Sequence, residues 1–128
     1  MVAAVVSGAP STVVALVRGD DVLGATRAAG TLIPGRGDRP GVVAGLAAHA
    51  ALSIWWGGVL TAVVRRVGGG AVTGALAGAA VAALDLGVVA RRYPAIRALP
   101  RGPQWADHLV FGAVVGGTVP ACRCTRSR

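Results

Sequence analysis

Apolar residues run along this chain in four long blocks, and short segments rich in arginine, glycine and proline separate them. An α-helix needs about 20 predominantly apolar residues to cross the roughly 30 Å of hydrocarbon in a bilayer. The pattern therefore predicts an all-α transmembrane bundle of four helices, in a single domain over residues 1–122. The expected spans cover about 2–17, 41–64, 67–90 and 104–122.

The first block is the weakest of the four. It has only 16 residues and contains Ser7, Gly8 and Pro10, so the alternative is three spans preceded by a re-entrant or interfacial N-terminal segment. No basic region precedes it, as one does in a signal peptide, and we expect it to be retained. Residues 22–33 are apolar at helical spacing, but Arg27 interrupts them, which favours a short interfacial helix.

Composition favours a bilayer over water as the solvent of most side chains. Hydrophobic residues make up 54% of the chain and charged residues only 14%, whereas soluble domains carry roughly a quarter charged residues. The net charge of +8 comes from thirteen arginines. A basic chain can bind nucleic acid, but these arginines lie in the gaps between apolar blocks, as in membrane proteins. The expected partner is therefore the lipid bilayer and no nucleic acid.

The distribution of arginine predicts an orientation. The segments 18–40 and 91–103 carry four arginines each and lie on one side if all four blocks span. The other side has Arg65, Arg66 and the basic tail 123–128, which we expect to be disordered. Because the arginine-rich side faces the cytoplasm, we expect a multi-pass protein of the bacterial inner membrane with both large loops cytoplasmic and both termini outside.

Small residues recur every fourth position in three of the blocks. Residues four apart lie on one face of a helix, and helices in lipid associate by close contact, which small residues permit. Each stripe therefore predicts a packing face, within the bundle or between copies in a homo-oligomer. The residues expected to pack are Gly41, Gly45, Ser53 and Gly57, then Gly70, Gly74 and Gly78, and finally Gly112 and Gly116.

Four ionisable residues fall inside the apolar blocks near the same predicted membrane face: His49, Asp85, Asp107 and His108. Such residues usually face the bundle interior and have a partner. We expect His49, Asp85 and either Asp107 or His108 to form a polar cluster. The cluster can be structural, with hydrogen bonds between helices, or it can handle protons, because histidine titrates near neutral pH.

The sequence gives no reason to expect an enzyme. It contains no nucleophile elbow, phosphate-binding loop or HExxH motif. Cys122 and Cys124 have neither the number nor the spacing of a zinc site, and the two His and two Asp lack clustered ligand spacing. We therefore expect no catalytic residue, no metal and no cofactor. The leading hypothesis is a non-enzymatic protein that packs against itself or a membrane partner, and the alternative is a small transporter or proton-responsive subunit.

From Gly41 onward the chain resembles small multi-pass membrane proteins of bacteria with GC-rich genomes, such as actinobacteria. The likeness rests on AHAALSIWWG at 48–57, GALAGAAVAALDLG at 74–87 and ADHLVFG at 106–112. The His-xxx-Ser spacing in one span and the His-Leu that opens the last are similar to YagU-like inner-membrane proteins. The resemblance implies an inner-membrane location and an association with acid tolerance, and it implies no catalytic residues.

Overall fold

A computed structural model describes residues 2–120, and every regular element in that part of the chain is a helix. Expectations about the tail 123–128, Cys122 and Cys124 lie outside the described residues. In chain order the elements are α1 (Val2–Val6), α2 (Ala9–Arg18), α3 (Gly24–Ala29), the 3-10 helix η1 (Gly30–Leu32), α4 (Val42–Val67), α5 (Gly70–Gly87), the 3-10 helix η2 (Val89–Arg92), α6 (Pro94–Arg97) and α7 (Arg101–Thr118).

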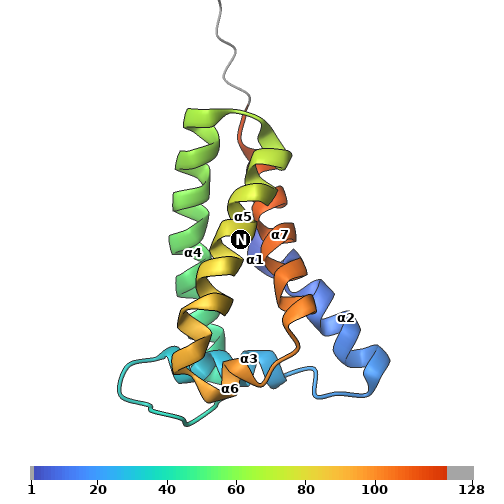
Figure 1. The fold of residues 1–128 in the computed structure, drawn as a ribbon, viewed down its shortest axis with the longest axis vertical. Coiled ribbons are helices and arrows are strands. Elements are labelled where there is room, and N and C mark those ends of the chain that lie inside the picture. The colour runs from blue at the N-terminus through green and yellow to red at the C-terminus, as the bar shows by residue number, and fades with distance from the viewer. Residues whose placement is uncertain (1, 121–128) are drawn as a thin grey trace, which may run out of the picture.

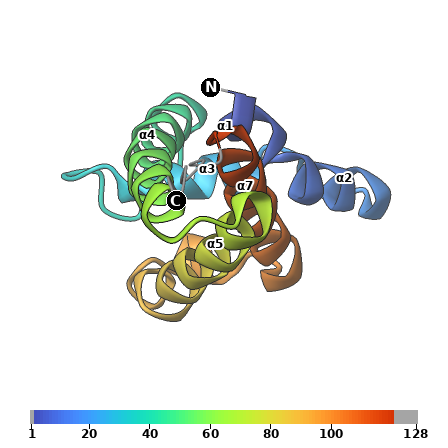
Figure 2. The same cartoon turned by 90° about the horizontal axis from the view of Figure 1, so that it is seen from above.

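The three long helices α4, α5 and α7 stand side by side and alternate in direction (Figure 1). The short helices α3 and α6 lie together at the end where α4 begins and α5 finishes. The segments 18–41 and 88–101 lie at that same end, so eight arginines gather there, while Arg65 and Arg66 lie at the opposite end. Viewed along the long axis, α2 projects away from the other helices (Figure 2).

Two helical stretches are long and apolar enough to cross a membrane, namely α4 and the stretch Gly70–Arg92 formed by α5 and η2. At 1.5 Å per residue, the 26 residues of α4 extend about 39 Å. The helix continues past the expected end at 64, and Arg65 and Arg66 occupy its last turn. Their positive charge stabilises the helix there, because the C-terminal end of the helix dipole is negative. Three successive glycines at 68–70, all with positive φ, then reverse the chain.

The N-terminal block, expected as either a short span over 2–17 or a re-entrant segment, consists of two helices. It forms α1 and α2 with a break at Ser7 and Gly8, and together they are too short to rank with the two long apolar stretches. Pro10 is the second residue of α2, where its missing N–H costs no hydrogen bond. The first half of α7 carries Gln104, Asp107 and His108 and also Arg101 ahead of the expected start, and this helix is not one of the two long apolar stretches.

The segment 93–103 contains three prolines, which predict an extended connector, but it is partly helical. It holds all of α6, and α7 begins at Arg101, before the expected start at 104. Proline permits this because Pro94 and Pro103 both lie in the first turn of their helices. The expected helix at 22–33 forms as α3 followed by η1.

A small apolar core joins the three long helices. Leu60 of α4, Val81 of α5 and Val115 of α7 are buried together, and Trp56 and Phe111 pack against them. Many large apolar side chains elsewhere are exposed, especially along α2 and α4. The core is thus narrow, and much of the apolar surface faces outward.

Candidate functional site

Among the described residues, the most extensive helix contact joins α5 and α7, and glycines form it. A Cβ atom built on Gly74 would overlap the carbonyl oxygen of Gly112 and lie 2.9 Å from the Cα of Gly116. The relation is reciprocal, since a Cβ on Gly112 would overlap the carbonyl oxygen of Gly74. Backbone touches backbone here without an intervening side chain, and the small size of glycine permits this close approach.

The same register continues at both ends of this interface. A Cβ on Gly78 would overlap the carbonyl oxygen of His108, and one on Gly116 would overlap that of Gly70. The small-residue stripes predicted on these two helices therefore face each other over about two turns, and we call this contact the glycine interface. It is defined by Gly70, Gly74 and Gly78 of α5 and by His108, Gly112 and Gly116 of α7.

The stripe of α4 does not pack as one face against another long helix. A Cβ on Gly45 would overlap the carbonyl oxygen of Thr26 in α3, and Gly30 of η1 meets the backbone of Gly41. Gly57 instead lies near Phe111, whose Cζ would be 3.8 Å from its Cβ, and Ser53 is only half-buried. The first turns of α4 thus hold the short helix α3 and not a second span.

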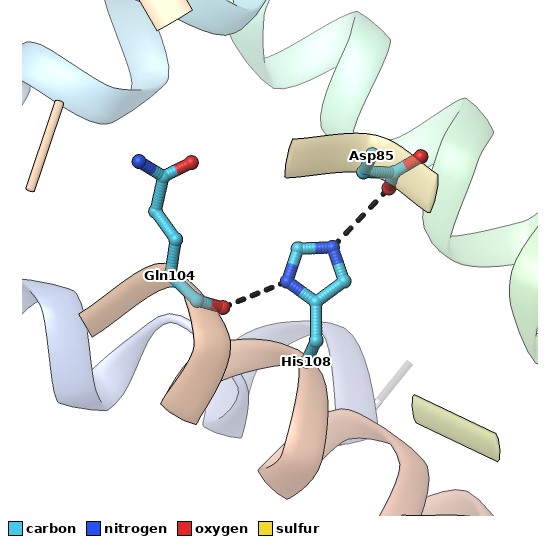
Figure 3. Close-up of polar contacts among 3 residues, drawn as sticks. All are labelled: Asp85, Gln104 and His108. Carbon is cyan, nitrogen blue, oxygen red and sulfur yellow. Dashed lines mark hydrogen bonds and ion pairs between the residues drawn. The ribbon is translucent and has the colours of Figure 1, made fainter. Parts of the chain in front are cut away.

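Asp85 and His108 meet directly across the glycine interface (Figure 3). The His108 Nε2 lies 3.2 Å from Asp85 Oδ2, and both side chains are about three-quarters buried, with exposed fractions of 24% for His108 and 26% for Asp85. The other ring nitrogen, Nδ1, lies 2.7 Å from the backbone oxygen of Gln104, one turn earlier in α7. The glycines bring the two helices close enough for this contact.

The contact between Asp85 and His108 can be a hydrogen bond only if the pair carries one further proton. A carbonyl oxygen only accepts hydrogen bonds, so Nδ1 must donate to Gln104. In a neutral imidazole the other nitrogen then has no hydrogen, and an ionised carboxylate has none either. The 3.2 Å contact is attractive only when one further proton lies on the imidazole or on the carboxyl group.

His108 is thus the one of the two expected residues, Asp107 or His108, that contacts Asp85, whereas His49 forms its direct hydrogen bond elsewhere. His49 Nε2 lies 3.1 Å from the Ala4 backbone oxygen in α1, and the side chain forms no direct hydrogen bond to Asp85 among the described residues. Asp107 is adjacent to His108 but turns to another neighbour, because its Oδ1 accepts a hydrogen bond of 3.0 Å from the Ser11 backbone N–H. The predicted cluster therefore divides into one pair and two contacts with the N-terminal helices.

The contact with Ser11 completes the start of α2. The N-cap residue Gly8 has no side chain to bind the free amides of the first turn. Asp107 supplies that acceptor from α7, and its negative charge also suits the positive end of the helix dipole. Sequence reasoning missed this contact, since nothing in residues 8–11 indicates which distant carboxylate would cap them.

Within residues 2–120, no group of three His, Cys, Asp or Glu side chains is arranged to hold a metal ion. Comparison of the chain with protein-family models, with curated proteins and with solved structures finds no match. The function must therefore be argued from the glycine interface, the Asp85–His108 pair and the exposed apolar surface.

Proposed function

We propose that this chain is a multi-pass protein of the bacterial inner membrane that acts by helix packing, with itself or with a membrane partner, and without catalysis of its own. The observation that carries the proposal is the exposure of its most apolar helices. Only 11% of the most apolar window of α4 is buried, and 28% of that in the stretch Gly70–Arg92. The core helix of a soluble protein would be mostly buried, so lipid or a partner covers these faces.

The bundle in this proposal has four membrane helices, the first being the broken pair α1 and α2, which enters from one side as a short or re-entrant span. The eight arginines at one end of the molecule support a cytoplasmic location for residues 18–40 and 91–103. The likeness to YagU-like proteins agrees with the same location.

Cysteine labelling tests the proposed location and orientation. Cys122 and Cys124 are replaced by serine, and single cysteines are placed at Gly37, Ala98 and Gly68 in turn. We expect a membrane-impermeant maleimide to label position 68 in intact spheroplasts, and positions 37 and 98 only after the membrane is opened. Labelling of 37 and 98 in intact spheroplasts reverses the orientation, and release of the protein by alkaline extraction removes the multi-pass proposal.

The Asp85–His108 contact supports a second candidate, a proton-responsive or proton-conducting membrane protein. A contact that needs one proton, held between two helices near the arginine-rich end, can bind and release that proton. Purified protein in liposomes with a pH-sensitive dye inside tests conduction. Proton flux above that of empty liposomes, abolished by Asp85→Asn and unchanged by Asp38→Asn in the exposed loop, would support the candidate. Flux equal to that of empty liposomes excludes conduction.

A further inference from the structure

An apolar groove of about 670 Å³ runs between α2 and α7. One face of each helix lines it: Ala9, Pro10, Val13, Val14 and Arg18 from α2, and Gly102, Pro103, Ala106 and Val110 from α7, with Val6 of α1 at one end. The α7 residues lie at spacings of three and four, so they form a single strip about 12 Å long at 1.5 Å per residue. The volume lies within the range of small-molecule sites, about 300–1,000 Å³.

The lining is apolar along its length and cationic at one end. Arg18 is its one charged lining residue. This residue is the last of α2, the helix that projects away from the others (Figure 2). Among the described residues, the guanidinium of Arg18 forms no ion pair. A ligand that fits this lining has a long apolar part and an anionic end.

The surroundings of Arg18 reinforce the same charge preference. The segments 18–41 and 88–101 at this end contain eight arginines and three aspartates, and one of those aspartates, Asp21, is already paired with Arg27. Basic residues next to the apolar surface of a membrane protein attract anionic lipid headgroups. The far end of the groove, at Val6 and Val110, has no charged lining residue.

We infer that this groove binds an anionic phospholipid, with one acyl chain along the strip of α7 and the phosphate at Arg18. The inference rests on the proposed membrane location. It gives α2 a role that its projecting position otherwise lacks, since an acyl chain would fill the space between α2 and α7. A second copy of the chain is the competing occupant, and the experiment below separates the two.

Binding of phosphatidylglycerol and phosphatidylcholine with identical acyl chains, measured by native mass spectrometry on the full-length protein in detergent, tests the inference. We expect phosphatidylglycerol to bind more tightly to the wild-type protein. Arg18→Gln should weaken phosphatidylglycerol about fivefold and leave phosphatidylcholine unchanged, which is the effect of losing one arginine near a headgroup. The matched control Arg66→Gln removes the same charge at the other end and should change neither.

Filling the groove provides an independent variant. Ala106→Trp should reduce binding of both lipids, whereas Val72→Trp on the exposed surface of α5 should not. Equal binding of the two lipids to the wild-type protein, or equal losses with Arg18→Gln and Arg66→Gln, overturns the inference. A dimer that Ala106→Trp dissociates, without lipid selectivity, assigns the groove to a second copy and also overturns it. Either result leaves the membrane location standing if cysteine labelling supports it.

Discussion

At the residue scale, single glycines decide whether α5 and α7 can touch. Where a Cβ atom would fall on a backbone oxygen, no rotamer relieves the overlap, and the helices must separate. That makes even alanine too large at Gly74 and Gly78. Replacing a glycine by alanine at an open helical position only reduces the backbone freedom of the unfolded chain, which stabilises the fold. The surroundings of each glycine therefore decide whether alanine raises or lowers the stability.

Gly74→Ala and Gly78→Ala should each destabilise the protein by about 1–3 kcal/mol, the usual cost of overpacking, and leucine at either position should cost more. Gly58→Ala in α4 is the matched control, since a Cβ there meets nothing within 4 Å and alanine favours the helix. Thermal unfolding in detergent measures the stability of these variants and of the control. If all three alanine variants unfold at the wild-type temperature, the glycine interface does not hold α5 against α7.

The proton between Asp85 and His108 makes stability depend on pH. The contact is intact at low pH and is lost as pH rises through the loss of that proton, after which Nε2 and Oδ2 are two acceptors facing each other. We therefore expect the wild-type unfolding temperature to fall as pH rises. The loss of this contact should lower the free energy of unfolding by about 1–3 kcal/mol.

Asp85→Asn isolates this effect. The asparagine amide can donate to Nε2 of neutral His108, so the contact no longer needs a titrating proton, and stability should vary less with pH than in the wild-type protein. Asp85→Leu removes the contact at every pH and serves as the reference. Parallel pH profiles for the wild-type and Asp85→Asn proteins would show that no proton is held between these side chains.

At the scale of elements, α2 is attached to the rest of the molecule mainly along α7, and Asp107 provides the polar part of that attachment. The carboxylate binds a backbone amide that no residue of α2 itself can satisfy. Loss of an N-cap acceptor costs about 0.5–2 kcal/mol, and here it would also release the start of the helix from α7.

Asp107→Ala should therefore free α2 to move relative to α7, while Asp107→Asn, which keeps the acceptor oxygen, should hold it. Spin labels at Leu16 and Leu109, both exposed, report the separation of the two helices by electron paramagnetic resonance. We expect a single narrow distance distribution for the wild-type protein and Asp107→Asn, and a broad one for Asp107→Ala. A narrow distribution in all three would mean that apolar contacts alone position α2.

The positions of the long helices could largely be predicted from the sequence. Which other helix packs against each helix face could be predicted only in part. Apolar blocks bounded by arginine and glycine located α4 and α5 to within a few residues, because helix length and hydropathy are local properties. Helical period also gave the faces of Gly74 and Gly112. The helical period could not reveal that Gly45 packs against α3. That helix reaches Gly45 only because the segment 33–41 folds back and the Gly41 backbone N–H donates to the backbone oxygen of Arg27.

The polar residues show the same limit. Asp85 and His108 lie on stripes that face each other, so their contact follows from the period and from alternating helix directions. His49 lies on the stripe of α4, which turns toward the N-terminal helices instead. Backbone acceptors such as the Ala4 oxygen leave no trace in the sequence, and neither the His49 nor the Asp107 contact could be predicted from it.

At the scale of the whole molecule, α4 presents an apolar surface that no part of residues 2–120 covers. Ile54 and Trp55 are 73% and 67% exposed, and the small residues Ala51, Gly58 and Ala62 are exposed beside them. Small residues next to an aromatic side chain allow another helix to approach closely. If the protein acts by packing, this face of α4 is where a second copy or a partner makes contact.

A photo-reactive amino acid at Trp55 should therefore crosslink to protein in intact membranes, giving either a dimer or one discrete heavier adduct. The same group at Val72 of α5, which is equally exposed at 71%, is the matched control and should react mainly with lipid. Equal crosslinking at both positions would indicate chance collision. Absence of protein adducts at Trp55 would leave α4 facing lipid alone and would remove the packing function.

The glycine interface has a consequence for biogenesis. Its two halves are far apart in order of synthesis, because Gly112 is made 38 residues after Gly74. At about 5–20 residues per second, a ribosome takes roughly 2–8 s to cover that interval. During this interval α5 already exists, but α7 does not, so the glycine face of α5 and the Asp85 side chain have no α7 to contact. For the proposed membrane protein, this means that the insertion machinery or α4 must shelter α5 until the last helix is made.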